Sequence, residues 1–322
     1  MVSCRLRRCG QFAALLVTSF TLSGCSDGPA GAQTEFMVST RDIGCPPTIE
    51  TPNLGENSPV QDIAGIRPGM SFDQAVAILA CRGDVSHIEY APLWNVRESH
   101  GVETRQLLRA SDGTPCTQAE SRASPAVCED AGGRLTPLKG FTQEFAVVFT
   151  GLPGEERAHA VWRHQSFSED NYPITEELLT SLAEKYGPPH LDRTGHHFYI
   201  SKIRSGSLPL YWNYRYPAGS ITPRPADTMS AMESYRNCIN GPTPWFGTRK
   251  SWNTPLFNPQ SEWRAGCGLT IRAEVVPVRD NAFRTRELNV VVMNQTTLSR
   301  ETQAFEARLR EVGSVGGARP DL

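Results

Sequence analysis

No stretch of the 322-residue sequence is long and apolar enough to cross a membrane as a helix. Such a helix needs about 20 consecutive apolar residues. The longest predominantly apolar run, residues 12–22 (FAALLVTSFTL), falls well short of this length. Nothing comparable follows it, so we expect the rest of the chain to form a water-soluble body.

Several motifs that carry known chemistry are also absent. The chain has no S-x-x-K, no H-E-x-x-H and no glycine-rich phosphate loop. The formal net charge is only −2, and beyond residue 24 the basic residues do not form runs. A nucleic-acid partner would need a basic surface. We therefore predict no catalytic residues, no cofactor and no nucleic-acid partner.

The chain does have an export signal at its start. Three arginines between residues 5 and 8 precede the apolar run of residues 12–22, which is the layout of a signal peptide. Residues 22–25 (LSGC) resemble the bacterial lipobox, in which the cysteine thiol receives a lipid and the chain is cut just before the cysteine. The alternative is an ordinary secretory signal that contains a cysteine by chance.

The lipobox resemblance implies a lipoprotein signal peptide over residues 1–24 and a mature chain that starts at Cys25. Acyl chains such as palmitate on this residue would anchor the protein, because each buried methylene contributes about 0.8 kcal/mol. The membrane is then a partner, and the expected location is the cell envelope with the body facing the periplasm. Ser26, in place of an aspartate, favours the outer membrane over the inner one.

The cysteine content fits an oxidising compartment. Nine cysteines are present, of which two leave with the signal and Cys25 carries the lipid, so six remain. An even number in an exported chain predicts disulfides, although six cysteines can pair in many ways. Metal binding is the weaker alternative, because none of the six has the short C-x₂₋₄-C spacing of zinc sites. The expected pairs are Cys116–Cys128 around a polar loop, Cys238–Cys267 around an irregular segment, and the remaining Cys45–Cys81.

Composition divides the mature chain into parts. Residues 25–60 are rich in Pro, Gly, Ser and Thr, which is typical of a flexible tether. Residues 61–220 are expected to form a first α+β region with two helix-plus-sheet units. Residues 221–313 are expected to form a C-terminal region in which a disulfide holds a hairpin and a helix, and residues 314–322 a disordered tail.

Two helices of similar layout are predicted, over residues 71–83 and 175–187. In the first, Ser71 and Gln74 form a capping box, and in the second Thr175 is the expected N-cap. The apolar stripes that should be buried are Phe72, Ala75, Val76 and Leu79, and then Leu178, Leu179, Leu182 and Tyr186. The matching lengths suggest a duplicated unit, and two similar helices arising by chance are the alternative.

Strands are predicted between and after these helices. The expected elements are the hairpin 141–167 with its turn at 151–154, the strand 208–216, the hairpin of 268–278 and 288–293 with a polar connection at 279–287, and the helix 299–312. Adjacent strands without a strand–helix–strand rhythm predict an α+β fold with antiparallel sheets and a few packed helices.

Residues 65–71 (GIRPGMS), with the helix after them, resemble the opening of the small outer-membrane lipoproteins of the BamE (SmpA/OmlA) family. Residues 185–188 (KYGP) resemble the closing motif of that family, whereas the first helix ends in residues 81–84 (CRGD) without a proline. The resemblance implies two-layer units of helices on an antiparallel sheet, in tandem as in the similar, doubled fold of the β-lactamase inhibitor protein. Met70 would anchor the turn under the helix. A role in outer-membrane assembly or integrity is also implied.

Aromatic residues are the best candidates for binding. Trp245, Trp252 and Trp263 crowd the segment between Cys238 and Cys267, and aromatic faces stack on sugars or anchor partner proteins. Loops of this kind on a rigid scaffold often carry binding. We therefore expect a non-catalytic binding or structural role with an envelope protein or a glycan as the partner.

The alternative is an extracytoplasmic hydrolase with an unrecognised site near His196, His197 and Asp192. Two further histidines, His159 and His164, lie in one predicted strand. Side chains alternate between the two faces of a regular strand, so the odd separation of this pair predicts opposite faces. We therefore do not expect these two histidines to hold a metal together.

Overall fold

The computed structural model describes residues 37–38, 45, 62–91, 104–124, 127–128, 135–187, 191–192, 208–214 and 269–315. All of them belong to the second of two compact units, which spans Phe36–Leu322. The predicted signal peptide and Cys25 lie outside the described residues. No helix of the described part is long and apolar enough to span a membrane.

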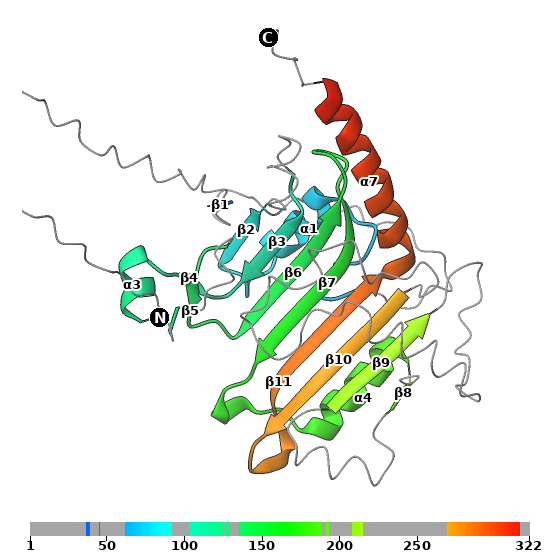
Figure 1. Cartoon of the computed structure of the whole chain (residues 1–322). Coiled ribbons are helices and arrows are strands. Elements are labelled where there is room, and N and C mark those ends of the chain that lie inside the picture. Colours follow the sequence, from blue (N-terminus) through cyan, green and yellow to red (C-terminus); the bar gives the residue numbers. More distant parts are fainter. Residues whose placement is uncertain are drawn as a thin grey trace, which may run out of the picture. The chain divides into compact units, whose positions relative to one another are not determined.

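One antiparallel sheet of nine strands forms the centre of this unit (Figure 1). Its strand order is β1-β2-β3-β6-β7-β11-β10-β9-β8, and a separate two-stranded sheet pairs β4 with β5. The strands are β1 (Met37–Val38), β2 (His87–Ala91), β3 (Leu107–Ser111), β4 (Thr114–Pro115), β5 (Leu138–Lys139), β6 (Gln143–Thr150), β7 (Arg157–Ser166), β8 (Leu191–Asp192), β9 (Leu208–Tyr214), β10 (Leu269–Val278) and β11 (Asn281–Asn294).

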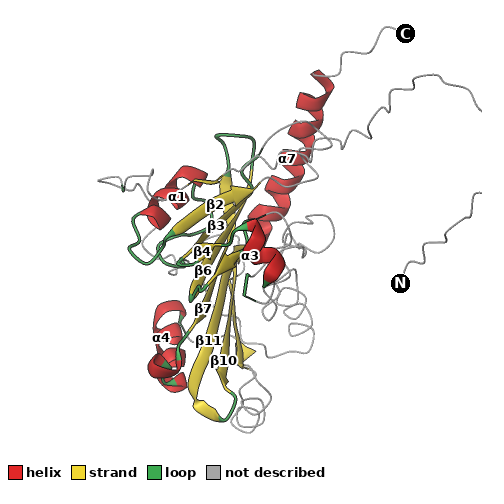
Figure 2. Ribbon diagram, turned by 90° about the vertical axis from the view of Figure 1, so that its left-hand side faces the viewer, coloured by secondary structure: helices red, strands yellow, loops and turns green. Residues whose placement is uncertain are grey.

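The helices of the described residues are few, which confirms the predicted α+β class with antiparallel sheets. They are α1 (Phe72–Ala80), α3 (Gln118–Ala123), α4 (Thr175–Tyr186), α7 (Gln295–Val315) and the single 3₁₀ turn η1 (Glu169–Asn171). In the edge view of Figure 2, α1 and α4 lie on one side of the large sheet and α3 and α7 on the other. We call these two sides the α1/α4 face and the α7 face.

The strand order consists of two consecutive meanders that meet at β7 and β11. The first half comprises α1 followed by β2, β3, β6 and β7, and the second half comprises α4 followed by β8, β9, β10 and β11. Each half runs from an outer strand to a central one, and the central strands pair antiparallel. The boundary expected near residue 220 falls between β9 and β10, which pair with each other.

The α1/α4 face carries the main apolar core. Strand alternation sends Phe145, Val147 and Phe149 of β6 to this face, whereas Ala146 and Val148 join a second apolar cluster on the α7 face. Met70 is fully buried in the main core beneath α1. Both helices therefore cover one continuous apolar surface.

Helix α1 follows its sequence pattern closely. The predicted capping box is present, because Ser71 and Gln74 each bind the backbone N–H of the other. The whole predicted stripe (Phe72, Ala75, Val76, Leu79) is buried. The helix ends at Ala80 with Cys81 as C-cap, so it is shorter than the predicted 71–83.

Helix α4 begins differently from the prediction. Its N-cap is Ile174, which has no capping side chain, and Thr175 is the first helical residue. The Thr175 hydroxyl lies 3.1 Å from the carbonyl oxygen of Ala282, to which it donates, and 3.0 Å from the hydroxyl of Thr285. This side chain therefore joins the helix to β11 instead of capping it. Of the predicted stripe, Leu182 and Tyr186 are buried, and Leu178 and Leu179 are only partly buried.

The predicted hairpin around residues 151–154 is confirmed by the pairing of β6 with β7. Gly151 has φ 127°, and a Cβ at this position would lie 2.7 Å from the carbonyl oxygen of Glu155. The turn therefore requires glycine here. A register shift after Val148 leaves one extra residue on β7 between Ala158 and Ala160.

The second predicted hairpin is longer than expected. Strand β11 begins at Asn281, so most of the polar connection expected over residues 279–287 is strand. Polar side chains are tolerated there because this end of the hairpin is largely exposed, with Phe283 82% exposed. The polarity of the segment reports its exposure and not an irregular backbone.

Helix α7 is also longer than the predicted 299–312. Among its described residues, Phe305 and Leu309 are buried apolar side chains, and they pack with the partly buried Leu152 of the β6–β7 turn. Arg308 forms an ion pair with Glu155 of the same turn. The third residue of the expected stripe, Val312, is 44% exposed.

Candidate functional site

Polar side chains occupy neighbouring cross-strand positions on the α7 face. In the sheet register His87 faces Ser111, Ser111 faces Glu144, Glu144 faces His164, and His164 faces Asn289. All five residues are buried. Burying polar groups is unfavourable unless they are paired, so this row requires a network of contacts.

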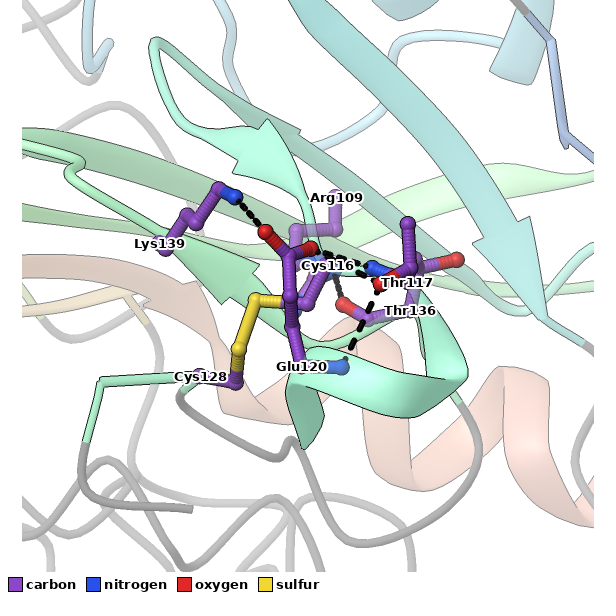
Figure 3. Close-up of a disulfide and its surroundings, with 7 residues drawn as sticks. All are labelled: Arg109, Cys116, Thr117, Glu120, Cys128, Thr136 and Lys139. Atoms are coloured by element: carbon purple, nitrogen blue, oxygen red, sulfur yellow. Dashed lines mark hydrogen bonds and ion pairs between the residues drawn. A yellow bond between two sulfur atoms is a disulfide. The ribbon is translucent and has the colours of Figure 1, made fainter. Parts of the chain in front are cut away.

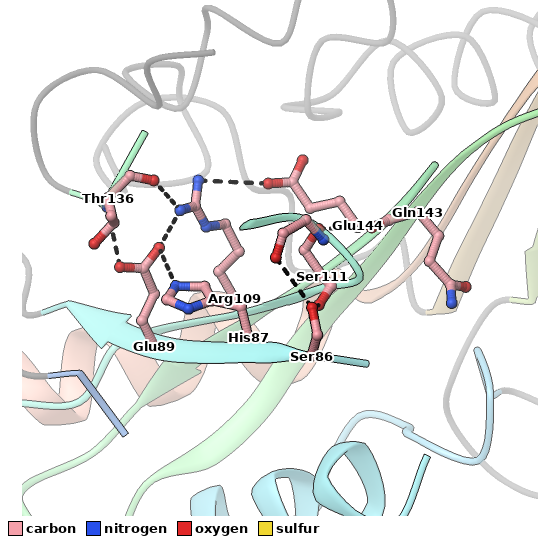
Figure 4. Close-up of polar contacts among 9 residues, drawn as sticks. Ser86, His87, Glu89, Arg109, Ser111, Thr136, Gln143 and Glu144 are labelled. Atoms are coloured by element: carbon pink, nitrogen blue, oxygen red, sulfur yellow. Dashed lines mark hydrogen bonds and ion pairs between the residues drawn. The ribbon is translucent and has the colours of Figure 1, made fainter. Parts of the chain in front are cut away.

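Arg109 lies at the centre of that network, between two carboxylates (Figure 4). It is 1% exposed, forms an ion pair with Glu89 opposite it on β2, and has Nη1 3.6 Å from Oε1 of Glu144. Glu89 and Glu144 are also buried. Removing the arginine would leave two buried carboxylates without its positive charge, which makes it the central cation of the cluster.

Glu89 is held in its ionised form. Burial alone would raise the pKa of this carboxyl group, but a hydrogen bond from His87, the charge of Arg109 and the backbone N–H of Thr136 together lower it below the usual value. The Nε2 atom of His87 lies 3.5 Å from Oε1 of Glu89. A buried carboxylate with these partners binds its neighbours strongly and is a poor proton acceptor.

Around His87 the cluster contains serine and glutamate side chains, but the geometry at this histidine does not support a catalytic triad. Ser111 donates its hydroxyl to the carbonyl oxygen of Gln143 (2.9 Å), and Ser86 donates to that of Gly113 (3.0 Å). The His87 nitrogen that approaches the cluster faces Glu89 instead of a serine. A nucleophilic serine would have to donate to the histidine. At His87 this arrangement can hold structure, and it does not activate Ser86 or Ser111. The histidine that does lie within hydrogen-bonding distance of a serine is His164, whose Nε2 is 3.0 Å from the hydroxyl of Ser166 and whose Nδ1 is 2.8 Å from Oδ1 of Asn289.

The Arg109–Glu89 pair binds the backbone of Thr136, which is distant from both residues in the sequence. Arg109 donates to the carbonyl oxygen of Thr136, and the N–H of Thr136 donates to Oε2 of Glu89 at 3.0 Å. Both backbone groups of one residue are thus held by a buried ion pair. The next residues lead directly into β5, so the cluster fixes the position of that strand.

Strand β5 in turn carries α3, which is held by several independent contacts (Figure 3). The Cys116–Cys128 disulfide closes the segment, and the N–H of Cys116 donates to the carbonyl oxygen of Pro137 at 2.8 Å. Thr117 and Glu120 form a capping box at the helix start. Glu120 also forms an ion pair with Lys139 of β5.

The capping carboxylate is strongly acidic. The hydrogen bond from Lys139, followed by the backbone N–H and the hydroxyl of Thr117, lowers the pKa of Glu120 to about 2. The group is therefore ionised at every physiological pH, and the contacts at the helix start persist. We call residues 114–128 and 135–139 the α3 module.

Helix α3 contributes nothing to a core, since none of its residues is buried. Its outward surface includes Ala119, Arg122 and Ala123, and Val127 beyond it is 58% exposed. An amphipathic helix usually persists because it buries one face. Here a disulfide, a capping box and an ion pair hold a helix that has no buried residue, and the buried Arg109–Glu89 pair holds the chain before the neighbouring strand β5.

The predicted disulfides Cys45–Cys81 and Cys116–Cys128 are both formed. Cys238, Cys267 and the lipidation residue Cys25 lie outside the described residues, as do the binding candidates Trp245, Trp252 and Trp263. The histidines of the hydrolase alternative, His196 and His197, also lie outside them, and Asp192 lies in β8. No group of three or more His, Cys, Asp or Glu side chains suited to a metal occurs in the described part.

The prediction that His159 and His164 lie on opposite faces is wrong. The extra residue in β7 is His159 itself, and its Nε2 lies 2.5 Å from the hydroxyl of Thr150. Thr150 alternates with Phe149 and so belongs to the α7 face, where His164 also lies opposite Asn289. A single bulge reverses the alternation on which the prediction depended.

Sequence reasoning missed the buried cluster and α3. The strand HIEYA (β2) alternates His87 and Glu89 with apolar residues, which is also typical of a strand with one wet face. Nothing in this pattern indicates that the polar face is buried. For α3 a signal existed, because Thr117 and Glu120 have the spacing of a capping box inside what was predicted as a polar loop.

Comparison of the chain with protein-family models, with curated proteins and with solved structures finds no match. The resemblance to the BamE family therefore rests on a few residues around the two predicted helices and stays a prediction. The function has to be argued from the chain itself.

Proposed function

We propose that the protein is a lipid-anchored protein of the cell envelope whose folded body binds a partner without catalysis. The lipobox-like residues 22–25 support the anchor. Two disulfides in the folded body support an oxidising compartment such as the periplasm. On this proposal the anchor lies in the outer membrane, and the role is in the assembly or integrity of that membrane.

The α3 module is the observation that carries the binding role. A six-residue helix with no buried side chain does not stabilise the fold through burial, yet it is held by a disulfide, an ion pair and a capping box. Holding a surface in one conformation reduces the entropy lost on association. We infer that the module presents Ala119, Arg122 and Val127 to a protein partner of the envelope, and that Trp245, Trp252 and Trp263 belong to the same binding function.

The anchor is tested by the mass of the mature protein. The wild-type chain should begin at Cys25 and exceed the mass of the bare polypeptide by a glyceride and acyl chains. The Cys25→Ala variant should keep its signal peptide and carry no lipid. A wild-type chain that begins elsewhere, or carries no lipid, would contradict the anchor.

The binding surface is tested by photo-cross-linking in intact envelopes. A photoreactive residue in place of Arg122 should form a defined adduct, and one in place of the exposed Glu184 on α4 should not. The same adduct should disappear in a Cys116→Ser/Cys128→Ser background, because the helix then loses its fixed position. No adduct at position 122, or an identical adduct at position 184, would refute this surface.

A further inference from the structure

The predicted tether, residues 25–60, is attached to the folded body at two described places. Strand β1 pairs with β2 through only two positions, Met37 with Glu89 and Val38 with Ile88. Beyond it Cys45 is bonded to Cys81, the C-cap of α1. We call β1 the strap.

The strap covers part of an edge strand. Without β1, the five-residue strand β2 would end the sheet on this side, with one row of backbone groups unpaired. Exposed edges of this kind template pairing with other chains. A two-residue ladder is too short to be stable unless something else keeps it in place.

The Cys45–Cys81 disulfide is close enough in the sequence to keep this ladder in place. Only six residues separate Val38 from Cys45, whereas 23 separate Val38 from Asp62, where the described body resumes. The probability of closing a flexible loop falls with about the three-halves power of its length. Loss of the disulfide should therefore reduce the docking of β1 by about sevenfold.

We propose that the Cys45–Cys81 disulfide is a redox-sensitive lock that keeps the strap over the β2 edge. Cys45 is exposed, so a reductant reaches it from solvent. A dithiol reductant attacks the bond, forms a mixed disulfide and then closes its own disulfide. It donates two electrons and two protons, and Cys45 and Cys81 are left as thiols. The strap then docks about sevenfold less, and the β2 edge is free for more of the time.

Amide hydrogen exchange on the full mature chain tests the lock. In a Cys45→Ser/Cys81→Ser variant, the β1 amides and the β2 amides that face β1 should lose up to about sevenfold in protection. Reduction of the wild-type chain should produce the same change. Unchanged exchange at β1 and at that edge of β2 would overturn the proposal.

Two further variants isolate the strap. The matched control Cys116→Ser/Cys128→Ser removes the other described disulfide and should leave β1 and β2 exchange unchanged. Val38→Pro should free the β2 edge with Cys45–Cys81 intact, because a proline breaks the two-residue ladder. If Val38→Pro leaves the β2 edge protected, the strap does not cover it. Protection in α4 reports whether each variant is folded.

The lock does not depend on the lipid anchor, and the two can fail separately. A chain without lipid but with exchange that depends on this disulfide sinks the anchor alone. A lipidated chain whose exchange ignores Cys45–Cys81 sinks the lock alone. If both hold, undocking of β1 after reduction also lengthens the chain between Cys25 and the first described residue that is held by the body, from the 11 residues of 26–36 to the 36 residues of 26–61.

Discussion

The two halves of the large sheet share one topology and are stabilised in different ways. In the first half β2 and β3 pair over five positions, whereas in the second half β10 and β11 pair over ten. These short strands are accompanied by two disulfides and by the buried ion pair Arg109–Glu89. The side chains of this pair are 2% and 5% exposed. In the second half the pair Arg286–Glu287 joins side chains that are 49% and 30% exposed.

Among the described residues, the short β2–β3 ladder and the additional fastening occur together. A long antiparallel ladder brings many backbone hydrogen bonds and cross-strand contacts. A short ladder brings few, and the first half gains stability and a fixed geometry from buried charges, disulfides and a well-capped helix. Those fasteners also position the α3 module and the strap, so the half that contains the short β2–β3 ladder carries both proposed functional elements.

Loss of the buried cation should have the largest effect. We expect Arg109→Met to lower the free energy of unfolding by about 3–5 kcal/mol, because Glu89 and Glu144 are then buried without their shared cation. Replacing Glu89 by leucine in the same chain should recover part of this loss. Denaturant unfolding measures both. In the second half Arg286→Met should stay within about 0.5 kcal/mol, and an equal loss there would remove the contrast.

Shortening one buried leucine side chain in each of the two covering helices should have the next largest effect. Leu79→Ala in α1 and Leu182→Ala in α4 each create a cavity, and such changes cost about 2–5 kcal/mol. Leu79 is fully buried and Leu182 is 7% exposed on a helix with a partly buried stripe, so Leu79→Ala should cost more. Thermal or denaturant unfolding of the matched pair decides this. The reverse order would show that α4 is the better anchored helix.

Acidification should destabilise the fold through His159. Burial, and to a smaller extent the charge of Arg300, lowers the pKa of this histidine from 6.5 to about 4. As the pH falls below 6.5 the unfolded chain takes up a proton that the folded chain refuses, so stability falls by about 1.4 kcal/mol per pH unit. The expected loss between pH 6.5 and 5 is about 2 kcal/mol. His159→Gln should flatten this part of the stability profile, and an unchanged profile would contradict the assignment.

Substitutions at the N-caps of α1 and α4 should have the smallest effects on the free energy of unfolding. Ser71→Ala removes the capping hydroxyl of α1 and should lower the free energy of unfolding by about 1 kcal/mol. Helix α4 lacks a capping side chain, so Ile174→Ser should raise it by a few tenths of a kcal/mol. Ser71→Thr, which keeps a hydroxyl, is the control. A loss from Ile174→Ser would mean that the apolar contacts of Ile174 outweigh a cap.

Local patterns in the sequence predicted local structure well. The spacing of Ser71 and Gln74 predicts the capping box, and the stripe of α1 is buried because helix geometry alone places those residues on one side. The hairpin at residues 151–154 follows equally from local turn chemistry. The N-cap of α4 was not predicted correctly from the local sequence, because the Thr175 hydroxyl has a partner more than a hundred residues away, on β11.

The candidate site was beyond such patterns. A polar residue on an alternating strand has the same local signal whether it faces water or an interior, so His87, Glu89 and Arg109 cannot be recognised as a buried cluster from their neighbours in the sequence. Only the pairing of β2 with β3 brings Glu89 opposite Arg109. The bulge at His159 is similar, because it is defined by the strand that it faces.

By itself the sequence determined the lipobox-like start, the helix faces, the turns and the antiparallel α+β class, since each depends on residues close together in the chain. Tertiary structure alone decided that two meanders join at β7 and β11 and that charges are buried on the α7 face. It also decided that β1 pairs with an edge strand and that Cys45 is bonded to Cys81. These features depend on contacts between distant residues, and their energies depend on burial, which no local pattern encodes.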